Sequence, residues 1–526
     1  MASSTELGDH DHDEYLISKV SITETVLVSS APVLQQPPKV VSLSNLDRQC
    51  PLLMYLVFFY KYPTTSSVDH NRIWSLDSVF QSLKSGLEET LSIWYPAGGR
   101  LIMTSSTDDD KVLRSNDVYH ETNNSKQSLG GLNLLCNNKG AVLAKAATVV
   151  KISELGDLSQ YNDFFGNLVY KPPPPVLDDQ HEDHFSQMPL VAAQVTKFGC
   201  GGYSIGIGIS HSLFDGPAAY EFMCAWASNS AIKPNKNKLD VIMDDELQPK
   251  PVVLVHDRDA LLMMVDNYSC HDDDNDDDEG VSCRAAAIDH LYQLIMQSAA
   301  AVASTDLLMI KSSNDDDNYV HKTFHLSSAF LNCLKKQVVG DNFSCSSFEL
   351  VAAHLWKAKT LALGLSMETM VCLQFAVDAR NKVDPPLPQG FTGNAYVLAS
   401  VALTASQVVD QSDHKAIVDK IREAKKSVTN KYVKSYMEAV AGGGSQQTSL
   451  PPLKELTLVS DWTRMPFHKV GFLQGEADYA SPLVAPVTEV IYFMQNPKDD
   501  KGIDMRIGLL PQYHDAFTRY FLTNTN

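Results

Sequence analysis

The sequence predicts a mixed α+β fold, made of two α/β domains of similar size that a long crossover joins. Three observations predict it. The chain has 526 residues, 44% of them hydrophobic, which is enough apolar material for more than one large core. Segments with strand spacing and segments with helix spacing occur together in both halves. Between the halves, residues 231–322 change to Lys, Asn, Pro and acidic runs, a composition typical of surface connections.

The N-terminal half begins with strands. Residues 16–28 predict one strand, and the apolar, aromatic run at 52–60 predicts a second, buried one. Apolar residues then recur at helical spacing over 76–94, and Pro and Gly residues end that helix. Residues 191–198 and 203–209 predict two more strands. In the second of these, bulky residues alternate with Ser and Gly, so one face is almost bare and lets another backbone or a ligand approach closely.

The second half starts near Thr323. The sequence predicts helices at 285–302, 347–363 and 416–433, and strands at 370–378, 487–494 and 502–509. We therefore divide the chain into a disordered acidic N-terminus (1–14), an N-terminal domain (15–230), a crossover with acidic insertions (231–322) and a C-terminal domain (323–526). An interface between domains is a preferred place for a ligand site.

The net charge of −20 is concentrated in short segments. Of the 63 acidic residues, 17 lie in four clusters, at 9–14, 108–110, 272–279 and 315–317, which leaves 46 acidic against 43 basic residues elsewhere. Like charges in such runs keep the backbone solvated. Because no basic stripe is available to neutralise phosphates, nucleic acid is not an expected partner.

The sequence lacks the segments typical of membrane or secreted proteins and the cysteine motifs typical of zinc sites. No apolar run reaches the ~18 residues that a membrane-spanning helix needs, and the N-terminus is polar and acidic, unlike a signal peptide. The nine cysteines have no C-x-x-C pair and no regular spacing, which favours reduced thiols over structural zinc. We expect a cytosolic protein with no transmembrane segment and no metal site.

The main candidate for chemistry is His211, in the segment Ser210-His211-Ser212-Leu213-Phe214-Asp215-Gly216-Pro217. The histidine comes where a strand gives way to a turn, and Pro217 fits the first turn of the helix that follows. An imidazole is well matched to taking a proton from a hydroxyl group at neutral pH. Asp215 would orient the ring or hold the turn. Spacing alone favours a structural role for both residues, with Asp215 as a helix N-cap.

A rival motif overlaps this segment. Gly202-Tyr203-Ser204-Ile205-Gly206 matches the G-x-S-x-G nucleophile elbow of serine hydrolases. That elbow needs a strand before the serine and a helix directly after it, whereas Ser204 comes early in an alternating strand. The context therefore disfavours a serine hydrolase. Neither a Walker A sequence nor a complete dinucleotide fingerprint occurs.

The segment around His211 resembles the H-x-x-x-D-G signature of the plant BAHD acyltransferases, and further segments resemble that family in family order. They are Ser44-Asn45-Leu46-Asp47, Leu87 through Tyr95-Pro96-Ala97-Gly98-Gly99-Arg100-Leu101, Ser347-Phe348-Glu349 through Ala353-His354-Leu355-Trp356-Lys357-Ala358, Ala376-Val377-Asp378-Ala379-Arg380, Pro385-Pro386-Leu387-Pro388 with Gly390-Phe391-Thr392-Gly393-Asn394, and Val459-Ser460-Asp461-Trp462-Thr463-Arg464-Met465-Pro466. The resemblance spans about residues 16–510.

The resemblance implies two domains of the CoA-dependent acyltransferase type with an active-site channel at their interface. His211 would be the general base that deprotonates an alcohol or amine acceptor for attack on an acyl-CoA thioester, with no covalent acyl-enzyme and no bound cofactor. Asp215 and Gly216 would be structural, with Asp215 paired to Arg258, Arg380 or Arg464. The resemblance further implies a cytosolic monomer in plant specialised metabolism.

The same resemblance suggests residues for the substrate and CoA channel. They are Arg380, Gly393, Asn394, Ser460, Trp462, Thr463 and Arg464. Arg464 has two interpretations, because a guanidinium group can bind an anionic acceptor bidentately or belong to an internal ion pair. Trp462 is expected in the wall or the core rather than as a specific stacking partner of a ligand.

The chain departs from the family at its second signature, Asp-Phe-Gly-Trp-Gly, where it reads Gly471-Phe472-Leu473-Gln474-Gly475. The lost Asp would be one member of an ion pair, with Glu476 or Asp478 as substitutes for its charge. Two alternatives follow from this departure. One is a catalytically degenerate protein resembling the eceriferum proteins, acting as a partner of fatty-acid elongation. The other is a channel that now runs another reaction, such as elimination or hydrolysis.

Overall fold

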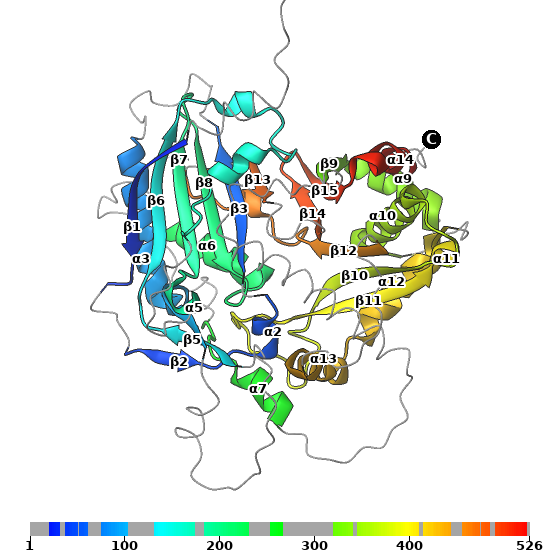
Figure 1. Cartoon of the computed structure of the whole chain (residues 1–526), viewed down its shortest axis with the longest axis horizontal. Coiled ribbons are helices and arrows are strands. Elements are labelled where there is room, and N and C mark those ends of the chain that lie inside the picture. The colour runs from blue at the N-terminus through cyan, green and yellow to red at the C-terminus, as the bar shows by residue number, and fades with distance from the viewer. Residues whose placement is uncertain are drawn as a thin grey trace, which may run out of the picture.

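Each half of the molecule is built on one six-stranded sheet, as the computed structural model shows (Figure 1). The structure describes residues 20–31, 37–50, 52–61, 75–103, 131–173, 184–230, 253–266, 319–339, 344–409, 414–442, 455–473, 475–483 and 490–522. The expected disordered N-terminus, the four acidic clusters and the expected helix at 285–302 lie outside these residues. The predicted mixed fold with two sheet-rich domains is confirmed.

The N-terminal sheet has the strand order β1-β6-β7-β8-β3-β13. Its strands are β1 (Val20–Val28), β6 (Ala141–Thr148), β7 (Val191–Lys197), β8 (Tyr203–Ser210), β3 (Leu53–Tyr60) and β13 (Tyr479–Pro482). The strands expected in this half correspond to β1, β3, β7 and β8, within a few residues at each end. β6 was missed because its alanine-rich sequence lacks clear alternation, although the turn residues Asn137, Asn138 and Gly140 directly precede it.

The bare face of β8 is used for close packing, as its sequence suggested. A Cβ atom on Gly206 would collide with the backbone carbonyl of Leu168, and one on Gly208 would lie 2.5 Å from the Tyr55 ring. Glycine is required at both positions because backbone and ring occupy the space of a side chain. The close contacts fix the position of the strand that leads to His211.

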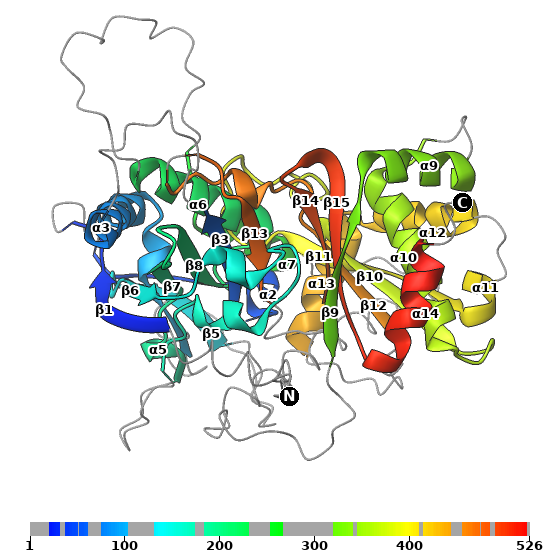
Figure 2. The same cartoon turned by 90° about the horizontal axis from the view of Figure 1, so that it is seen from above.

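Two helices cover one face of this sheet, α3 (Leu76–Ile93) and α6 (Gly216–Ser230) (Figure 2). The predicted helix at 76–94 is confirmed as α3. The Trp226 indole is fully buried, and its Nε1 donates to the Leu83 carbonyl at 2.9 Å. Each fully buried aromatic or aliphatic side chain contributes ~1.5–3 kcal/mol to stability. This packing fixes α6, and with it the turn that α6 shares with β8.

The C-terminal sheet has the order β11-β10-β12-β14-β15-β9. Its strands are β11 (Tyr396–Thr404), β10 (Met370–Asp378), β12 (Leu456–Asp461), β14 (Val490–Asn496), β15 (Asp499–Leu509) and β9 (Val320–Leu326). The helices of this half are α9 (Ser328–Val339), α10 (Ser347–Leu363), α11 (Ala405–Val409), α12 (His414–Ser427), α13 (Asn430–Gly442) and α14 (Pro511–Leu522). β10 and α10 match their predicted bounds.

The helix predicted at 416–433 is confirmed up to Ser427 as α12, but its continuation to residue 433 as one helix is wrong, because a second helix, α13, begins at Asn430. They separate at Val428 and Thr429. The Thr429 Oγ1 accepts a hydrogen bond from the Tyr432 backbone N–H at 3.3 Å, which is the geometry of an N-cap. The cap begins a new helix within a stretch whose apolar periodicity reads as continuous.

β13 joins the two halves of the molecule. It comes from the sequence range of the second half, yet it pairs antiparallel with β3 at the edge of the N-terminal sheet. Phe467, Val470 and Phe472, just before it, pack into the N-terminal core. The predicted domain boundaries assign β13 to the C-terminal domain. In the structure this C-terminal segment completes the N-terminal sheet.

The remaining described elements are short. A three-stranded sheet contains β2 (Lys39–Val41), β5 (Leu132–Cys136) and β4 (Arg100–Met103), and the short helices are α2 (Asn45–Arg48), η2 (Tyr95–Gly98), η4 (Ile152–Leu155), η5 (Asp163–Asn167), α5 (His184–Gln187), α7 (Asp259–Asp266) and η7 (Phe467–Lys469). None of the helices in the described part of the chain combines the length and apolarity that crossing a membrane would require.

Candidate active site

His211 directly follows β8, where the strand gives way to the turn before α6. Its backbone N–H donates to the Leu52 carbonyl at 2.9 Å, so the pairing of β8 with the segment of β3 extends to the histidine itself. The side chain is half-buried. Its ring lies against Tyr396 at the start of β11, with 5.5 Å between the ring centroids. Residues of both sheets therefore meet at His211.

The imidazole is held by Asn394, a buried residue from the predicted channel set. The Nδ1 of His211 lies 3.1 Å from Oδ1 of Asn394. The Nδ2 of Asn394 donates to the His211 carbonyl at 2.7 Å and to Oδ1 of Asp47 at 3.1 Å. Its backbone N–H donates to the same Asp47 oxygen at 3.0 Å. Both the ring and the backbone of His211 are thus fixed by one amide side chain.

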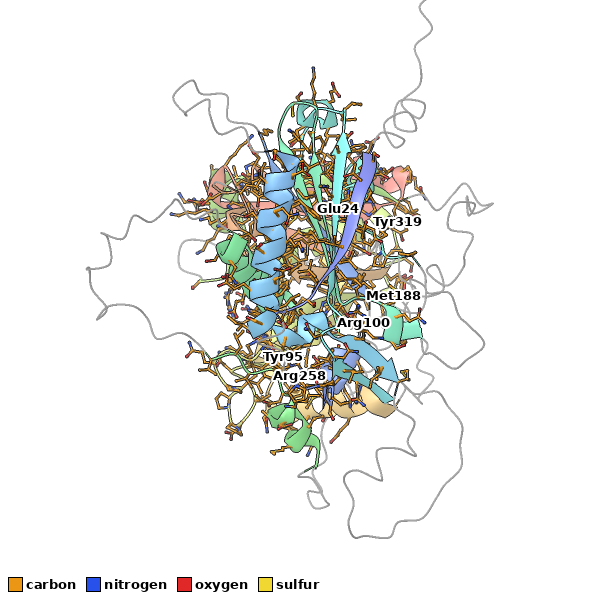
Figure 3. All side chains as sticks on the ribbon, turned by 90° about the vertical axis from the view of Figure 1, so that its left-hand side faces the viewer. Glu24, Tyr95, Arg100, Met188, Arg258 and Tyr319 are labelled. Atoms are coloured by element: carbon orange, nitrogen blue, oxygen red, sulfur yellow. The ribbon has the colours of Figure 1, made fainter. Side chains whose placement is uncertain are left out.

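Asp47 and Arg258 form a buried ion pair behind Asn394. Their side chains are 0% and 1% exposed, and Arg258 Nε lies 3.1 Å from Asp47 Oδ2. The guanidinium also donates to the Leu213 carbonyl at 3.2 Å, in the turn after His211. Arg258 lies near Tyr95, the first residue of η2, which follows the C-terminal end of α3 (Figure 3). The pair connects the short helix α2, the segment before α7 and the turn that follows His211.

Asp215 pairs with Arg380, which decides between the three arginines considered from the sequence. Arg380 Nη1 and Nη2 donate to the two carboxylate oxygens at 2.8 and 2.9 Å. Asp215 Oδ1 also accepts from the Ala218 N–H at 3.2 Å, as an N-cap of α6, and Oδ2 accepts from the Ala395 N–H at 3.1 Å. No hydrogen bond joins Asp215 to the imidazole. Its contacts therefore hold the turn and the Gly393–Ala395 segment together.

Two glycines of the predicted set lie in close packing, and the contact at Gly393 is with a buried side chain. A Cβ atom on Gly393 would collide with the Arg258 guanidinium, and one on Gly216 would lie 2.8 Å from Sδ of Met465. Gly393 thus lets the buried arginine reach Asp47. Gly216 lets the 462–466 loop pack against the start of α6.

The remaining predicted channel residues lie at the end of β12. Trp462 Nε1 donates to Ser460 Oγ at 2.9 Å, and its ring packs against Phe467 and Tyr492. Thr463 donates to Asp461 through both its backbone N–H and its hydroxyl. Arg464 is exposed, and within the described residues it makes no hydrogen bond or ion pair. The structure therefore does not support the internal ion pair considered for Arg464.

A cavity of about 310 Å³ opens in the C-terminal half beside Thr463. Its wall includes Ser328 and Ser347 from the first turns of α9 and α10, together with Lys501 near the start of β15. The wall also contains the Asp500 carboxylate beside Lys501, so its hydroxyl, amide and charged groups together favour a polar ligand. A second, much smaller cavity of about 10 Å³ contacts Trp462.

The altered second signature is structural in this chain. Phe472 is buried and packs edge-on against Phe58 and Trp226, and its N–H lies 3.3 Å from the Tyr60 hydroxyl. Gly475 has a φ of +97°, which requires glycine. Glu476 is exposed, and Asp478 accepts from the Lys61 backbone N–H at 2.6 Å. Neither supplies a buried carboxylate in place of the lost Asp.

The rival serine motif does not form a nucleophile elbow. Ser204 is fully buried within β8, and six more strand residues separate it from the turn.

Sequence reasoning gave no role to Asp47, although Ser44-Asn45-Leu46-Asp47 was one of the family-like segments. The signal that could have identified it is the capping box of α2, which places an aspartate at the third helical position. Among the described residues, no group of three or more His, Cys, Asp or Glu side chains is arranged to hold a metal ion.

Comparisons with known proteins agree with this architecture. A family model described as Transferase family matches residues 124–521. The chain is 51% identical over 489 residues to the brassinosteroid-related acyltransferase 1 of Arabidopsis thaliana, covering 92% of this chain and 94% of the other. It is 25% identical over 489 residues to the omega-hydroxypalmitate O-feruloyl transferase of the same plant, covering 91% and 88%. The crystal structure of vinorine synthase matches with a TM-score of 0.62 at 18% identity, covering 96% of this chain and 98% of that one.

Proposed function

Because the chain belongs to the Transferase family of plant BAHD acyltransferases, we propose that it moves an acyl group from an acyl-CoA thioester to a hydroxyl group, or an amine, of a plant metabolite. His211 is the general base in this proposal, and acyl-CoA is a co-substrate rather than a bound cofactor. The alcohol oxygen attacks the thioester carbonyl while Nε2 of His211 takes the hydroxyl proton. The tetrahedral intermediate then expels the CoA thiolate, which receives that proton from the imidazolium.

The observation that carries this proposal is the hydrogen bond between His211 Nδ1 and Asn394 Oδ1. It uses one ring nitrogen for orientation and leaves Nε2 for a substrate. General base catalysis typically contributes ~10²–10⁴-fold to the rate. The rest of the acceleration comes from holding the two substrates together and from stabilising the thioester oxyanion.

The 51% identical relative suggests the acceptor to test first. We propose that the acceptor is the hydroxyl group of a brassinosteroid or of a similar polyhydroxylated compound. The cavity beside Thr463 is our candidate for part of the acyl-CoA, since its wall carries hydroxyl groups and Lys501. Arg464, which is exposed nearby in sequence, would bind an acceptor only if that acceptor is anionic.

The test measures free CoA released from a panel of acyl-CoAs with and without a brassinosteroid acceptor. We expect release only with the acceptor present, and a loss of ~10²-fold or more in His211→Ala. Unchanged turnover in that variant would exclude the proposed base. Mass spectrometry of the product distinguishes transfer from elimination or hydrolysis, because only transfer adds the acyl mass to the acceptor.

The departure of 471–475 from the family signature is the reason for a second candidate, a non-catalytic partner of fatty-acid elongation. The two candidates differ in what His211→Ala does in a plant that lacks the protein. Restored function with His211→Ala would favour the non-catalytic role, whereas failure at normal protein levels supports catalysis. We place either function in the cytosol, which imaging of a fluorescent fusion would test.

A further inference from the structure

We propose that Asp47 is a positioning residue of the reaction, which sets the tautomer of His211 through the amide of Asn394. The inference rests on the proposed role of His211 as the base and extends it to a residue that lies 164 positions earlier in the chain. It follows from which atoms in this buried chain of contacts can donate hydrogen bonds and which can only accept them.

Asp47 can only accept. Its Oδ2 receives the Ser44 N–H at 3.0 Å, the Ser44 hydroxyl at 2.6 Å and Arg258 Nε at 3.1 Å. Its Oδ1 receives the backbone N–H of Asn394 at 3.0 Å. With donors on both oxygens and an arginine in contact, the carboxylate is held in one orientation.

The carboxylate in turn orients the Asn394 amide. The terminal atom called Nδ2 faces two oxygens that cannot donate, Oδ1 of Asp47 at 3.1 Å and the His211 carbonyl at 2.7 Å. With the amide flipped, three oxygens would face one another without a proton between them, and Asn394 is completely buried from water. A buried acceptor without a donor costs ~1–3 kcal/mol, so the NH₂ group must point toward Asp47.

The orientation of the amide then fixes the imidazole. The atom that faces His211 Nδ1 at 3.1 Å is Oδ1, an acceptor, so Nδ1 carries the hydrogen. The neutral ring has only one N–H, which leaves the lone pair on Nε2. His211 is therefore ready to accept a proton at Nε2, and the imidazolium that forms keeps its Nδ1–H bond to Asn394. Asp47, compensated by Arg258, acts through orientation rather than through added charge.

Asp47→Asn tests this inference because it keeps the shape and adds a donor. The new amide can take two orientations, and each brings two donors together. In the first, its NH₂ group faces Arg258 Nε and the Ser44 donors. In the second, its NH₂ group faces the NH₂ group of Asn394. In the second arrangement only the His211 carbonyl still holds the Asn394 amide in its native orientation, and an Asn394 that turns over presents its own NH₂ to His211, which places the hydrogen on Nε2. We expect kcat to fall by ~10²-fold, within the range of general base catalysis, while KM for both substrates changes little.

A spectroscopic readout needs no substrate. In protein labelled with ¹⁵N-histidine, the His211 signals are assigned as those missing from His211→Ala. We expect Nδ1 to have the shift of a protonated ring nitrogen in the native protein, and this pattern to move to Nε2 or become mixed in Asp47→Asn. If Asp47→Asn does not fold, Asn394→Leu removes the acceptor Oδ1 directly and is expected to give the same loss of kcat and a mixed tautomer.

Asp504→Asn is the matched control, since Asp504 is also 0% exposed and accepts hydrogen bonds from Tyr479 and Asn496. We expect it to lower the melting temperature without moving the tautomer. Native tautomer and native kcat in a folded Asp47→Asn or Asn394→Leu would overturn the inference. Activity that survives His211→Ala would instead overturn the proposed base, so the two failures are distinguishable.

Discussion

At the scale of single residues, the contact between Asp215 and Arg380 decides how the turn after His211 is held. A buried carboxylate without a partner is costly, and here it receives a bidentate guanidinium, an α6 N–H and the Ala395 N–H. Through these bonds it joins the turn after His211 to the segment that carries Asn394. The aspartate of the motif thus positions the histidine without touching it.

We expect Arg380→Ala to lower the free energy of unfolding by ~3–5 kcal/mol, because Asp215 is left buried without its counter-charge. Urea denaturation monitored by tryptophan fluorescence measures this loss. Lys420→Ala serves as the control, since its pair with Glu423 is exposed and contributes at most ~0.5 kcal/mol. Equal stability losses in the two variants would show that the Asp215 pair does not hold the turn.

Local spacing in the sequence was sufficient to place His211 and Asp215 in one turn between a strand and a helix, because these parts lie within eight residues, while the roles proposed for them came from the family resemblance. The same reasoning could not choose between Arg258, Arg380 and Arg464. Nor could it find the role of Asp47, whose contact to Asn394 spans 347 positions in the chain. Such long-range partners follow from the pairing of the two halves, for which a single sequence has no spacing rule.

At the scale of elements, the position of β8 depends on glycines that leave room for neighbouring groups. The Leu168 carbonyl lies where a side chain on Gly206 would be, and the Tyr55 ring lies where one on Gly208 would be. The alternation of bulky and small residues made this strand predictable. The apolar run of β11 gave no such signal, since a short buried strand and a helix segment have similar composition.

We expect Gly206→Ala to destabilise the protein by ~1–3 kcal/mol, because the added methyl group overlaps backbone that cannot move aside easily. Thermal unfolding measures the change. Gly166→Ala is the control, since a Cβ atom there would meet only Lys171 Nζ, at 3.9 Å. A Gly206→Ala protein as stable as the control would mean that the Leu168 segment shifts freely away from β8.

At the scale of the whole molecule, His256 links the two halves and makes their contact sensitive to pH. Its Nε2 lies 2.9 Å from the Ile93 carbonyl at the end of α3, and its Nδ1 lies 2.9 Å from the Thr392 hydroxyl. Burial lowers the pKa of His256 from 6.5 to about 4. Arg258 and Lys39 also disfavour the charged ring, while Asp257 and the Ile93 carbonyl favour it.

Because the folded protein binds this proton less readily than the unfolded chain, stability is lost as pH falls from about 6.5 toward 4. His256 alone contributes ~3 kcal/mol to this loss. We expect His256→Gln to unfold more easily at pH 7 but to show a shallower fall in stability between pH 6.5 and 4. Urea titrations at several pH values measure the difference in slope. Parallel curves for the two proteins would contradict a buried neutral His256.

The second link between the halves is Arg506, which is buried where β13 has crossed to the N-terminal sheet. Its guanidinium donates to Ser481 Oγ at 3.0 Å and the Pro482 carbonyl at 2.7 Å on β13. It also donates to Thr323 Oγ1 at 3.1 Å and to the Ser159 carbonyl at 2.8 Å. One side chain thus binds four acceptors from three segments, of which the Ser159 carbonyl also accepts from the Thr323 hydroxyl at 2.6 Å.

Arg506→Leu keeps most of the volume and removes the guanidinium donor from the Ser481 hydroxyl and the Pro482 carbonyl of β13, whereas the Ser159 carbonyl keeps its bond from the Thr323 hydroxyl. At ~1–3 kcal/mol for each unsatisfied group, we expect a loss of several kcal/mol and local opening of β13 before global unfolding. Hydrogen exchange followed by mass spectrometry should show faster exchange at residues 479–482 and in β3, and not in α10.

Lys469→Ala, which removes an exposed contact at 3.8 Å to Asp500, is the control and should leave exchange unchanged. Uniform acceleration over both sheets would show instead that Arg506 stabilises the fold globally. Unchanged exchange in β13 would mean that β3 pairing alone holds the crossed strand.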